Sequence, residues 1–419
     1  MLDASVTSDA PVRDPDAADR HTPYDPTDSG APVPQPCAVG IRRTPMLSPI
    51  PLGPAAGVDA VEGNGTVVRA IIGSGVATGT ERRYVEFESS SGTPMFLSDP
   101  VTVASELSRV VYRVDPGGVT VLAFTTSLPD LAPTRPRLIA QSWVVDPGGS
   151  VTRVRTFTSE LPLQILALDA VEMTPGFAGV GVVEQADGSG ELVLVSVTDA
   201  IDTRPMATIA RIEADMPGDA ACDQTGRCTT AALVPSGTWS DVVVSSIDTT
   251  AIPPTIDTRV VERVPPLPFN PNAVRVERGE ELSTVALGVT ESTPEDPRSS
   301  MRGRVIVWWL RGTSVVARWE PPLTGASIAV PVGTAQASPT QGIAIIAGAR
   351  DLSATLLFGI ASAPGVVAGG LAPIASGVSG VDALTVARAG AVWSPTPGIF
   401  AVAIRRTNLE VLTLCGSGP

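Results

Sequence analysis

Lysine is absent from this chain of 419 residues and histidine occurs once, as His21 in the N-terminal tail. Without lysine there is no P-loop lysine, no Schiff-base lysine and no Ser-Lys dyad. A single histidine in a tail excludes a histidine-dependent triad and a histidine metal site. Neither a Gly-x-Ser-x-Gly motif nor a Gly-x-Gly-x-x-Gly motif in a strand-to-helix setting occurs. These absences argue against histidine catalysis and nucleotide chemistry.

Aromatic side chains are also scarce, at 4%, and the charge balance is acidic, with a net charge of −14 and a pI near 4.6. Nucleic-acid binding needs a dense basic surface, and the arginines here are scattered. We therefore expect no nucleic-acid partner.

Two long stretches, 321–349 and 352–381, carry no charged side chain. Each is long enough to span a bilayer. Proline and glycine interrupt both, for example at Pro331 and Pro364. We therefore interpret them as loops and buried strands and expect no transmembrane segment.

Cysteine is limited to four residues. Cys222 and Cys228 flank the polar loop Asp-Gln-Thr-Gly-Arg, which is easily closed as a small ring. Cys37 and Cys415 lie near the two ends of the globular part. The spacing does not suit zinc, and free thiols are the other alternative. We predict the disulfides Cys37–Cys415 and Cys222–Cys228, which imply an oxidising compartment.

Glycine and proline are abundant, at 40 each, and the hydrophobic residues are rich in valine and alanine. This composition is typical of many short strands joined by turns, and no convincing amphipathic helix is present. The expected strands are 67–72, 84–88, 109–114, 119–125, 138–145, 151–157, 181–184, 192–197, 241–245, 259–264, 274–277, 284–289, 305–310, 315–319, 343–347 and 355–360. Several runs, such as Val305–Leu310, are apolar without alternation, so we expect both of their faces to be covered.

Four similar phrases of the type Asp-Ala-Val-Glu begin at Asp59, Asp169, Asn272 and Asp382, at intervals of 110, 103 and 110 residues. Halving each interval gives a repeat somewhat longer than the ~40–50 residues of known propeller repeats. Interpolated starts near 114, 221 and 327 make seven units. The pattern predicts an all-β fold that resembles a β-propeller, with seven blades within a range of about six to eight.

Two turn sequences of the form Asp-Pro-Gly-Gly, at Asp115 and Asp146, are flanked by strands and predict two consecutive hairpins. The hairpins could form one four-stranded blade. They could equally belong to tandem β-sandwiches, which are the alternative fold.

Residues 1–36 are rich in Asp, Ala, Pro, Ser and Thr, and we predict a disordered acidic tether. This tract resembles the spacers that follow the lipidated cysteine of bacterial lipoproteins. With the propeller-like repeats, the chain resembles a secreted bacterial propeller lipoprotein. There is no lipobox cysteine, and the residues after Met1 do not form a signal peptide, so we expect an anchor only through a segment absent from this sequence.

We expect residues 37–419 to form the propeller domain. The last unit, from Asp382, is short, so an N-terminal strand around Ala38–Arg42 is expected to complete it. A Cys37–Cys415 bond would then close the ring.

Carboxylates are the remaining candidates for a site. Asp59, Asp169 and Asp382, with Glu62 and Glu172, would recur near the innermost strands and could bind calcium or act as the acid and base of a glycosidase. The alternative is that each aspartate hydrogen-bonds its own turn. We therefore assign no catalytic residue and no cofactor, and keep Asp59, Asp169 and Asp382 as calcium candidates.

The tryptophans and the 222–228 loop have structural interpretations. We expect Trp308 and Trp309 to lie in a buried strand, and the others to pack between units, namely Trp143, Trp239, Trp319 and Trp393. The loop between Cys222 and Cys228 is expected to protrude as a stapled surface turn, with a binding loop as the alternative.

The missing catalytic residue types favour a noncatalytic binding or scaffold module, monomeric and carried on a flexible tether. We expect it in the periplasm or at the cell surface, with an unknown protein or glycan of the envelope as its partner. The alternatives are a propeller hydrolase or lyase that uses carboxylates at the central channel, and a purely structural envelope protein.

Overall fold

The computed structural model describes the strands between Arg42 and Cys415 and, within residues 146–320, part of the connecting segments; side chains are described, with gaps, within residues 111–320. The chain divides into two units, Met1–Ala31 and Pro32–Pro419, and every described residue belongs to the second. The predicted tether over residues 1–36 lies outside the described residues.

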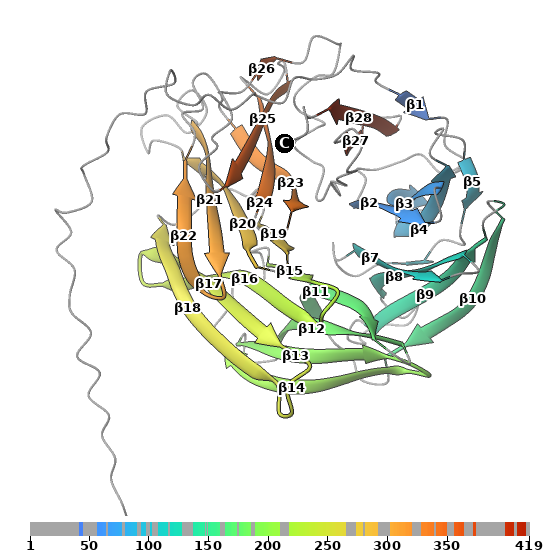
Figure 1. Cartoon of the computed structure of the whole chain (residues 1–419), viewed down its shortest axis with the longest axis horizontal. Helices are drawn as coiled ribbons and strands as arrows, with labels where there is room; N and C mark the ends of the chain where they lie inside the picture. The colour runs from blue at the N-terminus through green and yellow to red at the C-terminus, as the bar shows by residue number, and fades with distance from the viewer. Residues whose placement is uncertain are drawn as a thin grey trace, which may run out of the picture. The chain divides into compact units, whose positions relative to one another are not determined.

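The described strands form seven antiparallel sheets (Figure 1). Four of these sheets contain four strands each in chain order, namely β7 (Ser108–Asp115), β8 (Gly118–Ser127), β9 (Arg137–Val145) and β10 (Val151–Thr158); β11 (Gln164–Met173), β12 (Gly176–Glu184), β13 (Gly190–Val197) and β14 (Ile201–Ile209); β15 (Asp219–Cys222), β16 (Arg227–Ser236), β17 (Trp239–Asp248) and β18 (Thr255–Val264); and β19 (Val274–Arg278), β20 (Ser283–Glu291), β21 (Arg302–Arg311) and β22 (Ser314–Trp319).

The other three sheets come from the two ends of the second unit. They contain β2 (Gly57–Gly63), β3 (Thr66–Ala77), β4 (Thr80–Ser89), β5 (Pro94–Leu97) and β6 (Val101–Thr102); β23 (Ile328–Ser338), β24 (Gln341–Ala349), β25 (Leu356–Ala363) and β26 (Ala372–Pro373); and β1 (Arg42–Thr44), β28 (Leu409–Cys415) and β27 (Ile399–Arg405). The all-β prediction is confirmed. Among the described residues, none belongs to a helix that is long and apolar enough to cross a membrane.

The two Asp-Pro-Gly-Gly turns lie in one sheet, as the blade interpretation requires. The first joins β7 to β8, where Asp115 pairs with Gly118, and the second joins β9 to β10. In the second turn the Ser150 N–H donates to Asp146 Oδ1 over 2.9 Å. Two consecutive hairpins therefore form one four-stranded meander.

The repeat phrases mark the first strands of the sheets. Asp59 lies in β2 and Asp169 in β11, and Asn272 stands just before β19. The interpolated positions 114 and 221 fall in β7 and β15, and 327 falls next to β23. Asp382 lies outside the described residues. The sequence spacing therefore follows the sheet spacing.

The continuous apolar runs are buried on both faces because a neighbouring sheet packs on each side. In β13, Val193 packs in a core shared with β7–β9, whereas Leu192 packs in a second core shared with β15–β17. In the next sheet, Leu233 packs in a third core shared with β19–β21. The β11–β14 sheet and the β15–β18 sheet thus each contribute to two cores, whereas a β-sandwich leaves the outer face of each sheet in water.

The N-terminal strand pairs with the C-terminal one. In β1, Arg42 pairs with Val411 of β28, and β28 also pairs with β27. This is the arrangement expected when an N-terminal strand completes a short last unit, although β1 begins at the last residue of the expected segment. The predicted Cys37–Cys415 bond lies outside the described residues, because Cys37 is not among them.

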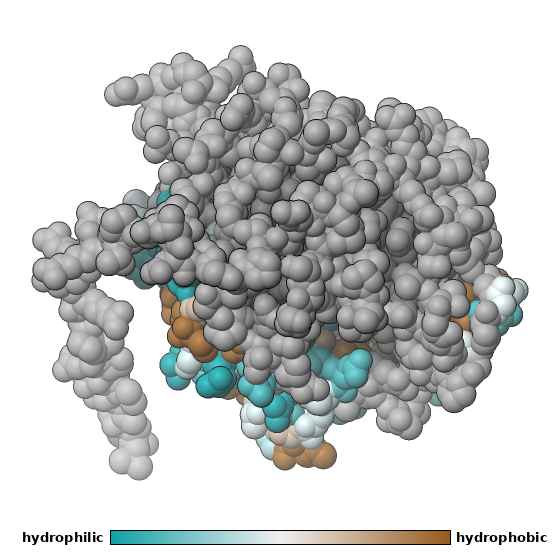
Figure 2. All heavy atoms as spheres, turned by 45° about the horizontal axis from the view of Figure 1, so that its top comes forward, coloured by the Kyte–Doolittle hydropathy of each residue, from teal (hydrophilic) through white to brown (hydrophobic). Residues whose placement is uncertain are grey.

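The last strand of each of the four central sheets is exposed and bulged. Register shifts occur in β10, β14, β18 and β22, opposite regular neighbours. Exposed valines on these strands include Val154, Val260 and Val316. Figure 2 shows apolar and polar residues side by side on the described surface. Bulges and charged residues on edge strands discourage edge-to-edge pairing.

Gly179 in β12 is expected to tolerate no side chain. A Cβ there would overlap the backbone of Asp169 and Ala170, whereas a Cβ at Gly181 would find Ala167 O at 3.3 Å as its nearest neighbour. We expect Gly179→Ala to lower the free energy of unfolding by about 1–3 kcal/mol or more, and Gly181→Ala by clearly less. Denaturant unfolding of the two variants measures this difference, and equal effects would contradict the packing described for β11 and β12.

Candidate functional site

Two aspartates of first strands bind the backbone of the next sheet. The Cys222 N–H of β15 donates to Asp169 Oδ2 of β11 over 2.7 Å, and the Val276 N–H of β19 donates to Asp219 Oδ2 of β15 over 2.8 Å. Both aspartates are buried, at 3% and 2% exposure. Each carboxylate therefore links consecutive sheets, a role that the prediction of a bond within its own turn did not include.

The turn between β15 and β16 is closed by a disulfide between Cys222 and Cys228, which also pair directly in the sheet. Inside it, Asp223 Oδ1 accepts hydrogen bonds from Thr225 N, Thr225 Oγ1 and Arg227 N over 2.8, 2.6 and 3.1 Å. Asp and Asn favour such turns because the side chain can bond backbone amides two to four residues on. The Cys222–Cys228 disulfide and the Asp223 carboxylate therefore stabilise the same turn.

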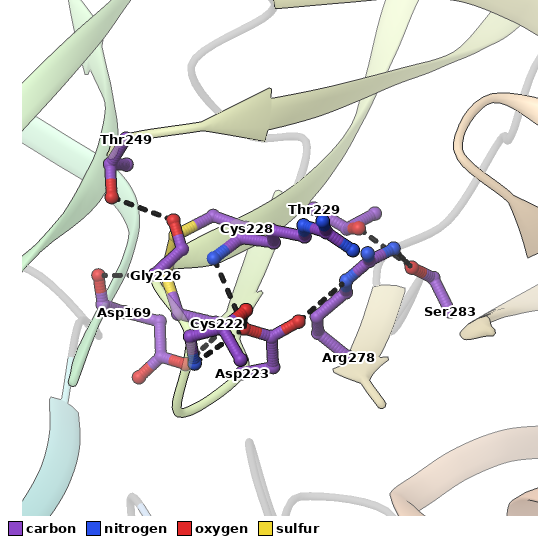
Figure 3. A network of polar contacts seen from close by, with 11 residues as sticks. Asp169, Cys222, Asp223, Gly226, Cys228, Thr229, Thr249, Arg278 and Ser283 are labelled. Carbon is purple, nitrogen blue, oxygen red and sulfur yellow. Dashed lines mark hydrogen bonds and ion pairs between the residues drawn. A yellow bond between two sulfur atoms is a disulfide. The ribbon is translucent and has the colours of Figure 1, made fainter. Parts of the chain in front are cut away.

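An arginine of the following sheet reaches this turn (Figure 3). Arg278 Nε lies 3.4 Å from Asp223 Oδ2, and the two side chains are each 5% exposed. Arg278 Nη1 donates to Ser283 Oγ over 2.9 Å, and Ser283 Oγ lies 2.7 Å from Thr229 Oγ1. Burial lowers the pKa of the Arg278 guanidinium, and the charge of Asp223 opposes that shift. Arginine keeps its proton in folded proteins, so Asp223 and Arg278 form an ion pair in which both side chains are almost fully buried.

The base of the turn is thus a junction of three sheets. Asp169 approaches it from β11, and Arg278 and Ser283 approach it from β19 and β20. Cys228 is fully buried and Asp223 is 6% exposed. Gln224, Thr225 and Arg227 are exposed, so the tip of the turn lies at the surface, as expected of a stapled surface turn, while its base is buried between the sheets. A buried pair with its hydrogen bonds made is suited to holding sheets together and is closed to a substrate.

The metal interpretation gains no support from the described side chains. Among them, no three His, Cys, Asp or Glu residues gather closely enough to hold an ion, and Asp169 is bound to a backbone amide. The side chains of Asp59, Glu62 and Glu172 lie outside the described part, as does all of Asp382. Asp59, Asp169 and Asp382 as calcium ligands therefore remain a prediction.

The tryptophans divide into buried and exposed. Trp143, Trp308 and Trp309 are 0–2% exposed, which confirms the expected buried strand, and Trp308 Nε1 donates to Glu262 Oε2 over 2.8 Å. Trp239 is 46% exposed. The expectation that it packs between units is wrong, because it lies at the turn between β16 and β17. Trp393 lies outside the described residues.

Sequence reasoning missed Asp219, Asp223 and Arg278. Asp219 begins Asp-Ala-Ala-Cys, a degenerate form of the repeated phrase within two residues of the interpolated start at 221. That phrase could have identified it. Arg278 had no signal, since its partner lies 55 residues earlier in another sheet.

Removing the Asp219 carboxylate is expected to destabilise the chain moderately. In Asp219→Ala the buried Val276 N–H loses its acceptor, which costs about 1–3 kcal/mol. The matched control is Asp199→Ala, because Asp199 is 95% exposed in its pair with Arg155 and such pairs contribute about 0–1 kcal/mol. Chemical unfolding compares the two, and a cost at Asp219 no larger than at Asp199 would rule out the inter-sheet role.

No family model matches this chain, and no curated protein matches it. Among solved structures it is similar to an ulvan lyase, described as a new family of polysaccharide lyase, with a TM-score of 0.47, 11% identity and coverage of 90% of this chain and 96% of that chain. It is also similar to an α-L-arabinofuranosidase of Fusarium graminearum, with a TM-score of 0.43, 7% identity and coverage of 91% of this chain and 98% of that chain. A third similar structure is a fungal lectin with a six-bladed β-propeller fold, Aleuria aurantia lectin, with a TM-score of 0.38, 10% identity and coverage of 64% of this chain and 78% of that chain.

These findings correct the predicted function. The prediction of a noncatalytic binding or scaffold module is wrong, because the similar structures include a lyase and an arabinofuranosidase, which agree better with its alternative, a propeller hydrolase or lyase. With TM-scores below 0.5, these structures assign the chain to no family and to no substrate.

Proposed function

We propose that this protein is an enzyme that cleaves glycosidic bonds, by hydrolysis or elimination, with carboxylates as its acid and base. The observation that carries the proposal is a repeated backbone position. Glu62 pairs with Val67 in the last pair but one of the β2–β3 hairpin, and Glu172 pairs with Phe177 in the last pair but one of the β11–β12 hairpin. Two glutamates thus occupy the same register position in the first strands of two sheets.

The residue inventory points to the same chemistry. A glycosidic bond can be cleaved by two carboxyl groups alone, one as acid and one as base or nucleophile, with separations of about 5–5.5 Å or 6.5–9.5 Å for the two stereochemical outcomes. The chain has no lysine and one histidine. Asp169 and Asp219 accept hydrogen bonds from the backbone of neighbouring sheets, and among the repeated acids we assign catalysis to Glu62 and Glu172 for their matching register position.

The finer points of architecture and setting are part of the proposal. The seven sheets would be the blades of a seven-bladed propeller, which the β1–β28 pairing would close. The Cys222–Cys228 disulfide supports a location outside the cytoplasm, in the periplasm or at the cell surface. We further propose a monomer, anchored through a segment absent from this sequence, with an envelope or environmental glycan as its partner.

A substrate panel tests the function. The full chain is incubated with neutral polysaccharides, with uronate-containing polysaccharides and with casein, because carboxylate pairs can also cleave peptides. New reducing ends would indicate hydrolysis, and absorbance of an unsaturated uronate would indicate elimination. The expected result is cleavage of at least one glycan. Cleavage of none by folded protein would overturn the proposal and favour a structural envelope protein.

A further inference from the structure

Trp239 stands apart from the buried tryptophans because nearly half of its surface is open, at 46%. It lies at the start of β17, directly after the two-residue turn at Gly237 and Thr238. Gly237 has a φ of +65°, and apart from its two chain neighbours no residue has an atom within 4 Å of where its Cβ would be. The space around this turn is therefore open to a ligand.

Three polar side chains share the sheet face of Trp239. In a strand, residues two apart point to the same face, as do residues paired directly across strands. Asp241 is two residues after Trp239, Arg263 pairs with Asp241, and Ser236 pairs with Trp239. The register thus places an indole, a carboxylate, a guanidinium and a hydroxyl together at one end of β16, β17 and β18.

The hydrogen bonds within this group hold it in place and leave donors for a ligand. Arg263 Nε donates to Asp241 Oδ1 over 2.6 Å and Nη2 donates to Oδ2 over 3.2 Å, with Ser236 Oγ at 3.4 Å from Nη2. Within the described residues, Nη1 makes no hydrogen bond, and the Arg263 side chain is 56% exposed. The hydrogen bond from Arg263 lowers the pKa of Asp241, so its carboxylate is an acceptor at neutral pH.

We propose that Trp239, Asp241, Arg263 and Ser236 form a subsite that binds a neutral glycan. A pyranose ring would stack on the indole, which offers a flat apolar face beside a polar edge. Its hydroxyls would meet the Asp241 acceptor and the Arg263 Nη1 donor. A neutral sugar fits better than a uronate, because Asp241 already neutralises Arg263 and the net charge of −14 repels polyanions.

This inference deepens the proposed function and rests on it only for the choice of a glycan as ligand. The subsite lies at the opposite end of β16 from the disulfide-closed turn, since β16 runs from Arg227 to Ser236. The subsite would hold part of a long polymer on the surface of the protein and would not itself cleave a bond.

Protection of Trp239 from oxidation tests the subsite without any mutation. The full chain is treated with N-bromosuccinimide, alone or with cellohexaose, xylohexaose, mannohexaose or polygalacturonate, and peptide mapping by mass spectrometry reads each tryptophan. Trp319, which is partly exposed in β22, serves as the internal reference. We expect a neutral hexaose to protect Trp239 and leave Trp319 unchanged. Equal oxidation of Trp239 with every neutral hexaose, or protection by polygalacturonate alone, would overturn the proposal.

Variants give the strength of binding. Trp239→Ala is expected to weaken binding of the protecting hexaose about tenfold, the equivalent of ~1.4 kcal/mol, and Trp239→Phe clearly less. In cleavage assays, Trp239→Ala should raise KM for the polymer. Unaltered binding by Trp239→Ala would contradict the subsite. Protection without any cleavage would instead contradict the proposed enzyme and keep the subsite, so the two failures are distinguishable.

Discussion

Replacing Arg278 by methionine is expected to lower the free energy of unfolding by about 3–5 kcal/mol, because it leaves a buried charge without its partner. The Asp223 and Arg278 side chains are each 5% exposed, so water cannot replace the lost guanidinium. Ser283 also loses the hydrogen bond from Arg278 Nη1. Asp223→Ala should cost a similar amount, since it strands the guanidinium and removes the acceptor of three turn hydrogen bonds.

The matched control for this pair is Arg204→Met. Arg204 pairs with Asp202 over 3.2 Å, but the two side chains are 76% and 56% exposed, so the expected loss is about 0–1 kcal/mol. Guanidinium unfolding under oxidising conditions measures the variants side by side. The double variant Asp223→Asn with Arg278→Met should recover part of the loss, because it buries no unpaired charge. A loss of unfolding free energy in Arg278→Met no larger than in Arg204→Met would contradict the stabilising role of the Asp223–Arg278 ion pair.

The second large effect is expected in catalysis. Glu62→Gln and Glu172→Gln should each lower kcat/KM for the cleaved glycan by about 10²–10⁴-fold, the usual contribution of general acid–base catalysis. The glutamine amide cannot act as acid or base, which explains the loss of rate. It is close in size to the carboxylate, so the free energy of unfolding should change little. Asp169→Asn is the control, because Asp169 is an acid of β11, as is Glu172, but it accepts the Cys222 N–H. At temperatures where this variant is folded, its kcat/KM should equal that of the unchanged chain. Full activity in either glutamine variant would remove that residue from the mechanism.

Much of the fold could be predicted because strand patterns and repeats are written locally. The run Val305–Leu310 indicated a strand covered on both faces, and it lies in β21 with its side chains 0–2% exposed. Several strands are missing from the predicted list, and for two of them, β14 and β16, the physical reason is clear. The centre of β16 is Thr229-Thr230-Ala231-Ala232, small side chains that fit between two packed sheets but give no strong strand pattern. β14 contains Pro205, which a strand tolerates only at an edge, and β14 is the edge of its sheet.

The polar contacts between sheets could not be predicted in the same way. Arg278 and Asp223 meet only because two sheets pack at a particular register, and no sequence spacing carries that information. Trp239 shows the same limit. A tryptophan at the start of a strand looks alike whether a neighbouring sheet covers it or not, and only the fold reveals its exposure of 46%.

The most direct measurement for the central claim is the pH dependence of kcat/KM for glycan cleavage by the full chain. Two catalytic carboxyl groups give a bell-shaped profile, and with no lysine and His21 alone in the tail, both limbs should belong to carboxyl groups. The expected profile has its optimum below pH ~7, and Glu62→Gln and Glu172→Gln should each remove one limb together with most of the rate. A rate that keeps rising into the alkaline range, or no cleavage at any pH by protein shown to be folded, would contradict a carboxylate-dependent glycan-cleaving enzyme.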